Sequence, residues 1–117
     1  MKTNKLTTLS KQKQISKVFE EGSSYSNRFF VVRALPNGGD GPRFVFAVGK
    51  RYGKAVERNR IKRRAREILR QNLDIIPTGY DYAIIPRLPC QTGEFAELET
   101  HLLQALAGAA SRKGNQQ

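Results

Sequence analysis

The chain has 117 residues, with 21 Lys and Arg against 10 Asp and Glu, which gives a net charge of +11. That length is typical of one domain, and an apolar fraction of 38% supports one modest hydrophobic core and not two. The sequence has no apolar run near the ~20 residues of a membrane span, which excludes a spanning protein, and the excess of positive charge favours a polyanionic partner.

The N-terminal quarter of the chain predicts a basic arm and a helix. Residues 1–9 are polar and basic without periodicity, so we expect a flexible arm. In residues 10–21 the apolar side chains recur at spacings of three and four, which is typical of a one-sided helix. Ser10 is the predicted N-cap, and Gly22 is the predicted stop, at the start of a turn over residues 22–27.

Two predicted strands follow this helix. Residues 28–35 and 43–48 are rich in β-branched and aromatic residues. The segment 36–42 between them is dense in Pro, Gly, Asn and Asp, which favours a turn. Both faces of residues 43–48 are apolar, so we expect this strand to be central and covered on both sides.

The C-terminal half predicts a helix over residues 55–72, a strand over residues 80–85 and a helix over residues 92–110, ahead of a polar tail from residue 111. The last helix has a single apolar face, and acidic residues in its first turns suit the helix dipole. We expect the tail to be flexible because it has no apolar side chain to bury.

This order of elements predicts an α/β (α+β) fold, a two-layer sandwich with a small central sheet. An extra short strand in residues 22–27 or 48–50 would fit the same architecture. We expect the whole chain, residues 1–117, to form a single domain that is ordered over about residues 6–110.

Most of the excess charge is concentrated in one predicted helix and the loop before it. Residues 50–70 hold ten basic residues against two acids, a net charge of +8, whereas the other 96 residues together carry +3. Arg58, Lys62, Arg66 and Arg70 are spaced by four and share one helical face, where like charges destabilise a helix unless anions neutralise them. We therefore expect this helix to bind a polyanion.

The composition of this helix favours RNA over DNA. Six of its seven basic residues between positions 58 and 70 are Arg, whose planar guanidinium bridges phosphates and stacks on bases. The helix also has an apolar face that would pack on the sheet, whereas a helix that reads the DNA major groove normally projects freely. We expect a concave RNA surface, with Arg60 and Arg64 pointing furthest from the core.

The chain has few residues suited to catalysis. One cysteine, Cys90, and one histidine, His101, cannot form an intrachain disulfide, a Cys/His zinc site or a paired-histidine nuclease site. A Cys90–His101 nucleophile pair and a protein-only nuclease with clustered carboxylates are alternatives, but no acidic pair is recognisable. We expect no catalytic residue, and the single cysteine with the polar N-terminus fits a cytoplasmic location.

The basic segment carries a recognisable motif. Residues 49–67, GKRYGKAVERNRIKRRARE, resemble the signature of the bacterial ribonuclease P protein family, with two basic residues, Gly, Ala-Val, Arg-Asn-Arg, Lys-Arg and a further Arg in order. The similarity extends outward and covers about residues 6–106. Ile15, Arg33 and Gly49 depart from the family pattern. The family often has an aromatic residue near position 15, some members have one at position 33, and Ser is common at position 49.

The resemblance implies a protein that assists a catalytic RNA in the endonucleolytic removal of the 5′ leader from precursor tRNA. The RNA would carry the chemistry with Mg²⁺ that it mainly holds itself, so the protein alone is expected to be inactive. The implied partners are the catalytic RNA and the leader, with neither DNA nor a membrane. The family fold also implies a left-handed crossover between parallel strands, against the general right-handed rule.

An alternative of another class is a ribosome-associated or structural RNA-binding protein with no role in cleavage. Under the ribonuclease P hypothesis, one group of residues contacts the catalytic RNA and its phosphates, and a second lines a cleft for the leader. Each member of the second group also suits the core, and no metal ligand is assigned. The RNA-binding group comprises Lys50, Arg51, Lys54, Arg58, Asn59, Arg60, Lys62, Arg63, Arg66 and Arg70, and the leader group comprises Ile15, Phe19, Phe29, Phe44 and Phe46.

Overall fold

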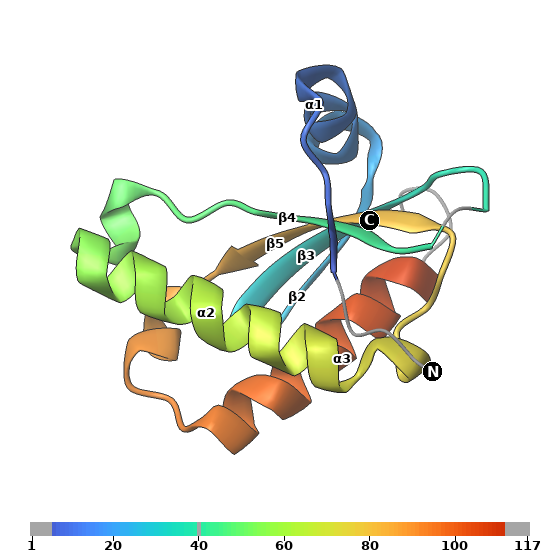
Figure 1. The fold of residues 1–117 in the computed structure, drawn as a ribbon. Helices are drawn as coiled ribbons and strands as arrows, with labels where there is room; N and C mark the ends of the chain where they lie inside the picture. Colours follow the sequence, from blue (N-terminus) through green and yellow to red (C-terminus); the bar gives the residue numbers. More distant parts are fainter. Residues whose placement is uncertain (1–5, 40, 112–117) are drawn as a thin grey trace.

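A computed structural model describes residues 6–39 and 41–111. This part of the chain forms a five-stranded sheet in the order β1-β4-β5-β3-β2 with three α-helices (Figure 1). The predicted order of helices and strands is confirmed, and two short strands are added at the sheet edges. The elements are β1 (Thr7–Thr8), α1 (Gln12–Glu21), β2 (Ser23–Ser26), β3 (Phe30–Pro36), β4 (Arg43–Phe46), α2 (Ala55–Gln71), β5 (Tyr80–Pro86) and α3 (Phe95–Ser111), with 3₁₀ turns η1 (Lys50–Tyr52), η2 (Leu73–Ile75) and η3 (Leu88–Gln91).

The central strand is β5, which pairs antiparallel with β3 and parallel with β4. The chain leaves β4, passes through α2 and returns as β5, so a crossover joins two parallel neighbours, as the resemblance implied. At the edges, β2 pairs antiparallel with β3, and β1 pairs parallel with β4. Of the two segments considered for an extra strand, 22–27 contains one and 48–50 does not.

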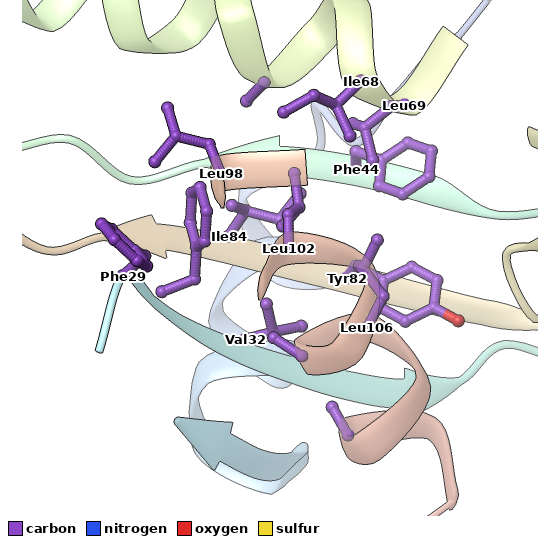
Figure 2. Close-up of a cluster of buried hydrophobic side chains, with 14 of the residues drawn as sticks. Phe29, Val32, Phe44, Ile68, Leu69, Tyr82, Ile84, Leu98, Leu102 and Leu106 are labelled. Carbon is purple, nitrogen blue, oxygen red and sulfur yellow. The ribbon is translucent and has the colours of Figure 1, made fainter. Parts of the chain in front are cut away.

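The main hydrophobic core lies between the sheet and the two helices α2 and α3, which cover the same face (Figures 1 and 2). Strand residues such as Val32 and Ile84 meet leucines of α3, and Phe44 meets the end of α2 (Figure 2). The Tyr82 ring stacks on Phe44 with 5.5 Å between centroids, and its hydroxyl donates to the Pro77 carbonyl at 2.7 Å. This burial raises the pKa of Tyr82.

A second, smaller cluster lies on the opposite face of the sheet. This is the face that α1 covers (Figure 1). Leu9, Val18 and Ala83 are buried there, and Ile15 and Phe19 of α1 pack against them while half-buried. Side chains alternate between the faces of a strand, so each central strand contributes to both clusters. β4 is accordingly covered on both sides, as predicted, although it is not the central strand.

The prediction of a loose N-terminal arm is wrong for the residues that the structure describes. Thr7 and Thr8 pair with β4, and the Leu9 N–H donates to the Phe44 carbonyl at 2.8 Å. Leu9 is also buried, with 2% of its surface exposed. The cause is the apolar pair at positions 6 and 9, which the polar composition of the segment obscured. The expectations for residues 1–5 and 112–117 lie outside the described residues.

Three element boundaries differ from those predicted. The N-cap of α1 is Lys11 and not Ser10. The strand predicted from residue 28 begins at Phe30, because the Asn27 side-chain oxygen accepts the N–H of Phe30 at 3.0 Å and holds a turn before it. The last helix begins at Phe95 and not at 92, after the 3₁₀ turn η3. None of these shifts alters the layers.

One buried carboxylate ties the start of β5 to its neighbours. Asp81 is 5% exposed and receives two hydrogen bonds from the Arg43 guanidinium, at 2.7 and 3.0 Å. The Asn37 amide donates a third at 2.9 Å. Because a buried carboxylate is costly without partners, these bonds fix the turn between β3 and β4 against β5. Arg43 is therefore a structural residue.

Gly22, at the junction of α1 and β2, is required by close packing and not by a left-handed backbone. Its φ is −70°, which any residue adopts, but a Cβ there would lie 2.5 Å from the Val18 carbonyl oxygen and 3.1 Å from that of Ala34. Both atoms belong to the backbone, so α1 would have to shift on the sheet. The helix therefore ends at the predicted glycine, but the reason is close packing and not a left-handed backbone.

We predict that Gly22→Ala lowers the free energy of unfolding by about 1–3 kcal/mol, the usual cost of overpacking a tight site. Gly49→Ala is the matched control, because a Cβ at Gly49 meets nothing within 4 Å. Urea denaturation of both variants gives the comparison. Equal stabilities of the two variants would show that α1 does not depend on this close contact.

Candidate RNA interface

The orientation of α2 is set by its apolar residues. Ile61, Ala65, Ile68 and Leu69 are buried against the sheet and α3. At the first turn, the Glu57 carboxylate accepts the Lys54 N–H at 3.0 Å. Gly53, with a φ of 155°, permits this approach because a Cβ there would collide with the Glu57 carboxylate. The face of α2 opposite the buried residues is therefore held towards solvent.

The predicted cations occupy this outer face and its borders. Arg60, Arg63, Arg66, Arg70 and Asn59 are exposed, whereas Arg58 and Lys62 are half-buried. In the described part of the chain, the one carboxylate within 4 Å of an α2 cation is Glu67, which lies 3.6 Å from Arg70. Such an exposed pair contributes ~1 kcal/mol or less. The outer face of α2 thus carries positive charge that this chain leaves largely uncompensated.

The N-terminal end of α2 extends the same charge. Lys50 and Arg51 lie exposed in η1, and Lys54 is exposed at the N-cap of α2. A helix N-terminus carries partial positive charge from its free N–H groups, so these side chains add to a field that already attracts anions. Arg58 reaches back to this end, where its guanidinium donates to the Gly53 carbonyl at 2.6 Å. We call these ten predicted residues together the α2 surface.

The expectation that the Arg64 side chain points furthest from the core is wrong. Its side chain is half-buried and leans towards the loop before α3, where it donates to the Gly93 carbonyl at 3.4 Å. There it lines a pocket of about 210 Å³ with Arg60, Tyr52 and Cys90, among others. Burial raises the pKa of Tyr52 to about 12. Sequence reasoning missed this pocket, since its walls come from three separate segments.

The structure does not support a Cys90–His101 nucleophile pair. The Cys90 thiol is buried and donates to the Phe29 carbonyl at 3.1 Å, and burial raises its pKa to about 11. His101 instead hydrogen-bonds through Nδ1 to the Glu97 carbonyl at 2.8 Å, and its ring packs against Phe29. A protonated, buried thiol without a base is a poor nucleophile.

The opposite face of the sheet presents a different surface, which we call the α1 face. Ile15 and Phe19 are half-buried there beside Leu35 and Val45. On the same face, the Arg33 guanidinium donates to the carbonyls of Gly22 at 3.3 Å and Val18 at 3.5 Å. These are C-terminal carbonyls of α1, so the cation also suits the helix dipole. The signal that could have identified Arg33 is its isolated charge within an apolar strand.

The five residues predicted to line a leader cleft do not lie together. Ile15 and Phe19 lie on the α1 face, as expected. Phe29 and Phe44 are corrections: they are 4% and 1% exposed in the main core, on the other face of the sheet. Phe46 lies on that other side too, half-buried with the Arg66 guanidinium 5.4 Å from its ring centroid. The sequence showed which aromatic residues share a strand face, but not which face α1 covers.

A metal-binding cluster and a membrane-spanning helix are both absent from the residues that the structure describes. No group of three or more His, Cys, Asp and Glu among them is arranged to hold a metal ion. None of the helices in this part of the chain has both the length and the apolar character needed to cross a membrane.

The comparisons with known proteins agree on one family. The family model "Ribonuclease P" matches residues 3–110. The ribonuclease P protein component of Carboxydothermus hydrogenoformans is 40% identical over 102 residues, 86% of this chain and 88% of that one. That of Finegoldia magna is 37% identical over 110 residues, 94% of this chain and 96% of that one. The solved ribonuclease P protein of Thermotoga maritima superposes with a TM-score of 0.78 at 36% identity, over 85% of this chain and 94% of that one.

We predict that Cys90 makes the protein less stable at alkaline pH. The unfolded thiol ionises near 9.0, whereas the buried thiol stays protonated up to about 11, so unfolding releases a proton between these values. The free energy of unfolding should therefore fall as the pH rises through this window. The measurement is urea denaturation at about pH 8 and pH 10, where Cys90→Ala should lose less stability than the native chain. An equal loss in both would mean that Cys90 is not the buried, protonated thiol described above.

Proposed function

The chain belongs to the bacterial ribonuclease P protein family, whose members are the protein subunit of a ribonucleoprotein endoribonuclease that processes tRNA, and from this premise we propose how its two surfaces divide the work. The α2 surface binds the catalytic RNA. The α1 face receives the 5′ leader of precursor tRNA. Family membership decides against a purely structural RNA-binding protein, which charge alone would also have allowed.

The observation that carries this proposal is the uncompensated charge of the α2 surface. Exposed arginines such as Arg60 and Arg63 have no carboxylate within 4 Å among the described residues, so an anionic partner relieves their mutual repulsion. Arg bridges phosphates through two parallel hydrogen bonds, and a folded RNA offers phosphates from several strands at once. A helix held flat on a sheet suits such a broad surface better than a narrow groove.

The α1 face suits a single-stranded leader. Phe19 and Ile15 offer partly accessible apolar surface, and the Arg33 guanidinium is held at the C-terminal end of α1 on the same side of the sheet. Aromatic side chains bind successive unpaired bases by stacking, whatever the sequence. Because α1 and α2 lie on opposite faces of the sheet, a leader on one face leaves the other free for the catalytic RNA (Figure 1).

In this proposal the protein contributes binding, and the RNA contributes the chemistry. We assign Mg²⁺ to the RNA because family membership implies an RNA-based enzyme; among the described residues no group of three or more His, Cys, Asp and Glu is arranged to hold a metal ion. Cys90 is protonated and has no base beside it, and Asp81 is engaged by Arg43 and Asn37. With precursor tRNA as the substrate, the cytoplasm is the proposed location of the protein.

The proposal predicts that holoenzyme affinity for precursor tRNA rises with leader length and then levels off, over leaders from zero to about ten nucleotides. Phe19→Leu, which keeps apolar packing, should flatten this dependence, because a stacked base contributes ~1–3 kcal/mol. The measurement is the Kd of precursor and mature tRNA with the reconstituted holoenzyme.

Arg63→Ala is the matched control for that experiment, because Arg63 is exposed on the α2 surface. It should weaken assembly with the catalytic RNA and leave the leader-length dependence of the assembled enzyme unchanged. An affinity independent of leader length, at a Mg²⁺ concentration where both complexes form, would reject leader binding and leave only general phosphate screening.

A further inference from the structure

A second hollow lies beside the α2 surface, where α2 passes the β1–β4 edge of the sheet. It has a volume of about 190 Å³. Sites for drug-sized ligands usually run to ~300–1,000 Å³, so this hollow suits a single small group. We call it the β4–α2 groove, and it is lined by Leu6, Thr8, Phe44, Phe46, Arg66 and Arg70.

The walls of this groove combine an aromatic ring with two cations. Phe46 is half-buried, and the Arg66 guanidinium lies 5.4 Å from its ring centroid. Arg70 lies one helical turn further on, and its carboxylate partner Glu67 is exposed and does not line the groove. Both an aromatic ring and a guanidinium stack on nucleobases, and a second guanidinium binds phosphate.

We infer that the β4–α2 groove binds one unpaired nucleotide of the catalytic RNA. The base packs against Phe46 and Arg66, and the phosphate lies at Arg70. This inference rests on the proposed function, because it takes the α2 surface as the binding site of the catalytic RNA. It adds a site that recognises a base to a surface otherwise built to bind phosphates.

The position of the groove favours the catalytic RNA over the leader. Arg66 and Arg70 belong both to the groove and to the α2 surface, so the two are continuous. An RNA bound to the α2 surface therefore extends directly into the groove. Phe19 and the rest of the α1 face lie on the opposite face of the sheet. A leader bound there would have to pass around the sheet edge.

The pocket beside Tyr52 is the competing candidate, and it is less suited to a nucleotide. The Glu57 carboxylate lines it and would repel phosphate. One of its two cations, Arg64, already donates to the Gly93 carbonyl. In the β4–α2 groove no acidic residue is among the lining residues, and Arg66 lies directly against the aromatic ring.

The test compares Phe46→Leu with the native chain in binding to the catalytic RNA. Leu keeps the groove apolar but removes the ring, so we expect about a fivefold loss of affinity or more, from the lower end of a stacked base's contribution. The salt dependence of binding should not change, because no phosphate contact is lost. Phe46→Tyr should keep native affinity, and Phe95→Leu, a half-buried aromatic outside the groove, is the matched control.

Chemical probing of the RNA 2′-hydroxyl groups locates the nucleotide. We expect one unpaired nucleotide of the catalytic RNA to change its reactivity with the native chain and with Phe46→Tyr, but not with Phe46→Leu. An unchanged affinity and footprint in Phe46→Leu overturn the inference, while a loss of affinity in Arg63→Ala would still support the proposed function. A Phe46→Leu variant that loses leader dependence, with normal binding of the catalytic RNA, would place the leader in the groove and also overturn it.

Discussion

The packing of one apolar stripe of α2 on the sheet determines where the charge of this protein is presented. Ile61, Ala65, Ile68 and Leu69 are buried, which fixes the rotation of the helix about its axis. The arginines between these residues therefore lie on the outer face of α2 or along the borders of its buried stripe. Burial of four apolar side chains outweighs the repulsion among the cations, because exposed like charges at this spacing cost only a few tenths of a kcal/mol each.

The alternation of side chains in three strands gives the sheet its two functional faces. In β5, Tyr82 and Ile84 point into the main core, and Ala83 between them belongs to the cluster under α1. The small Ala83 leaves room for Val18, and Gly22 lets the end of α1 approach the backbone of β3. The helix over one face and the basic helix over the other are therefore positioned by the same strands, an arrangement that the proposed binding of two RNA segments by one small domain requires.

The features that depend on local periodicity, such as the positions of the helices, were predicted correctly from the sequence. The features that depend on which helix covers which face of the sheet were not. The basic helix and the charged stripe along it follow from 3.6-residue spacing, and all ten predicted cation and amide positions lie on or beside that helix. Phe44 and Phe46 were correctly placed on one side of their strand, but nothing local says whether α1 or α2 covers it. Arg64 and the pairing of Thr7 with β4 were missed because their partners lie far along the chain.

The central claim, that the two faces bind different RNAs, is tested most directly by site-specific cross-linking in the assembled enzyme. Because Cys90 is buried, a photoreactive group attaches selectively to an exposed cysteine introduced by Gln12→Cys, beside the α1 face, or by Arg63→Cys, on the α2 surface. With catalytic RNA and precursor tRNA both present, the account predicts cross-links from position 12 to the leader and from position 63 to the catalytic RNA. Cross-links from both positions to the same RNA, or a reversed pattern, would contradict it.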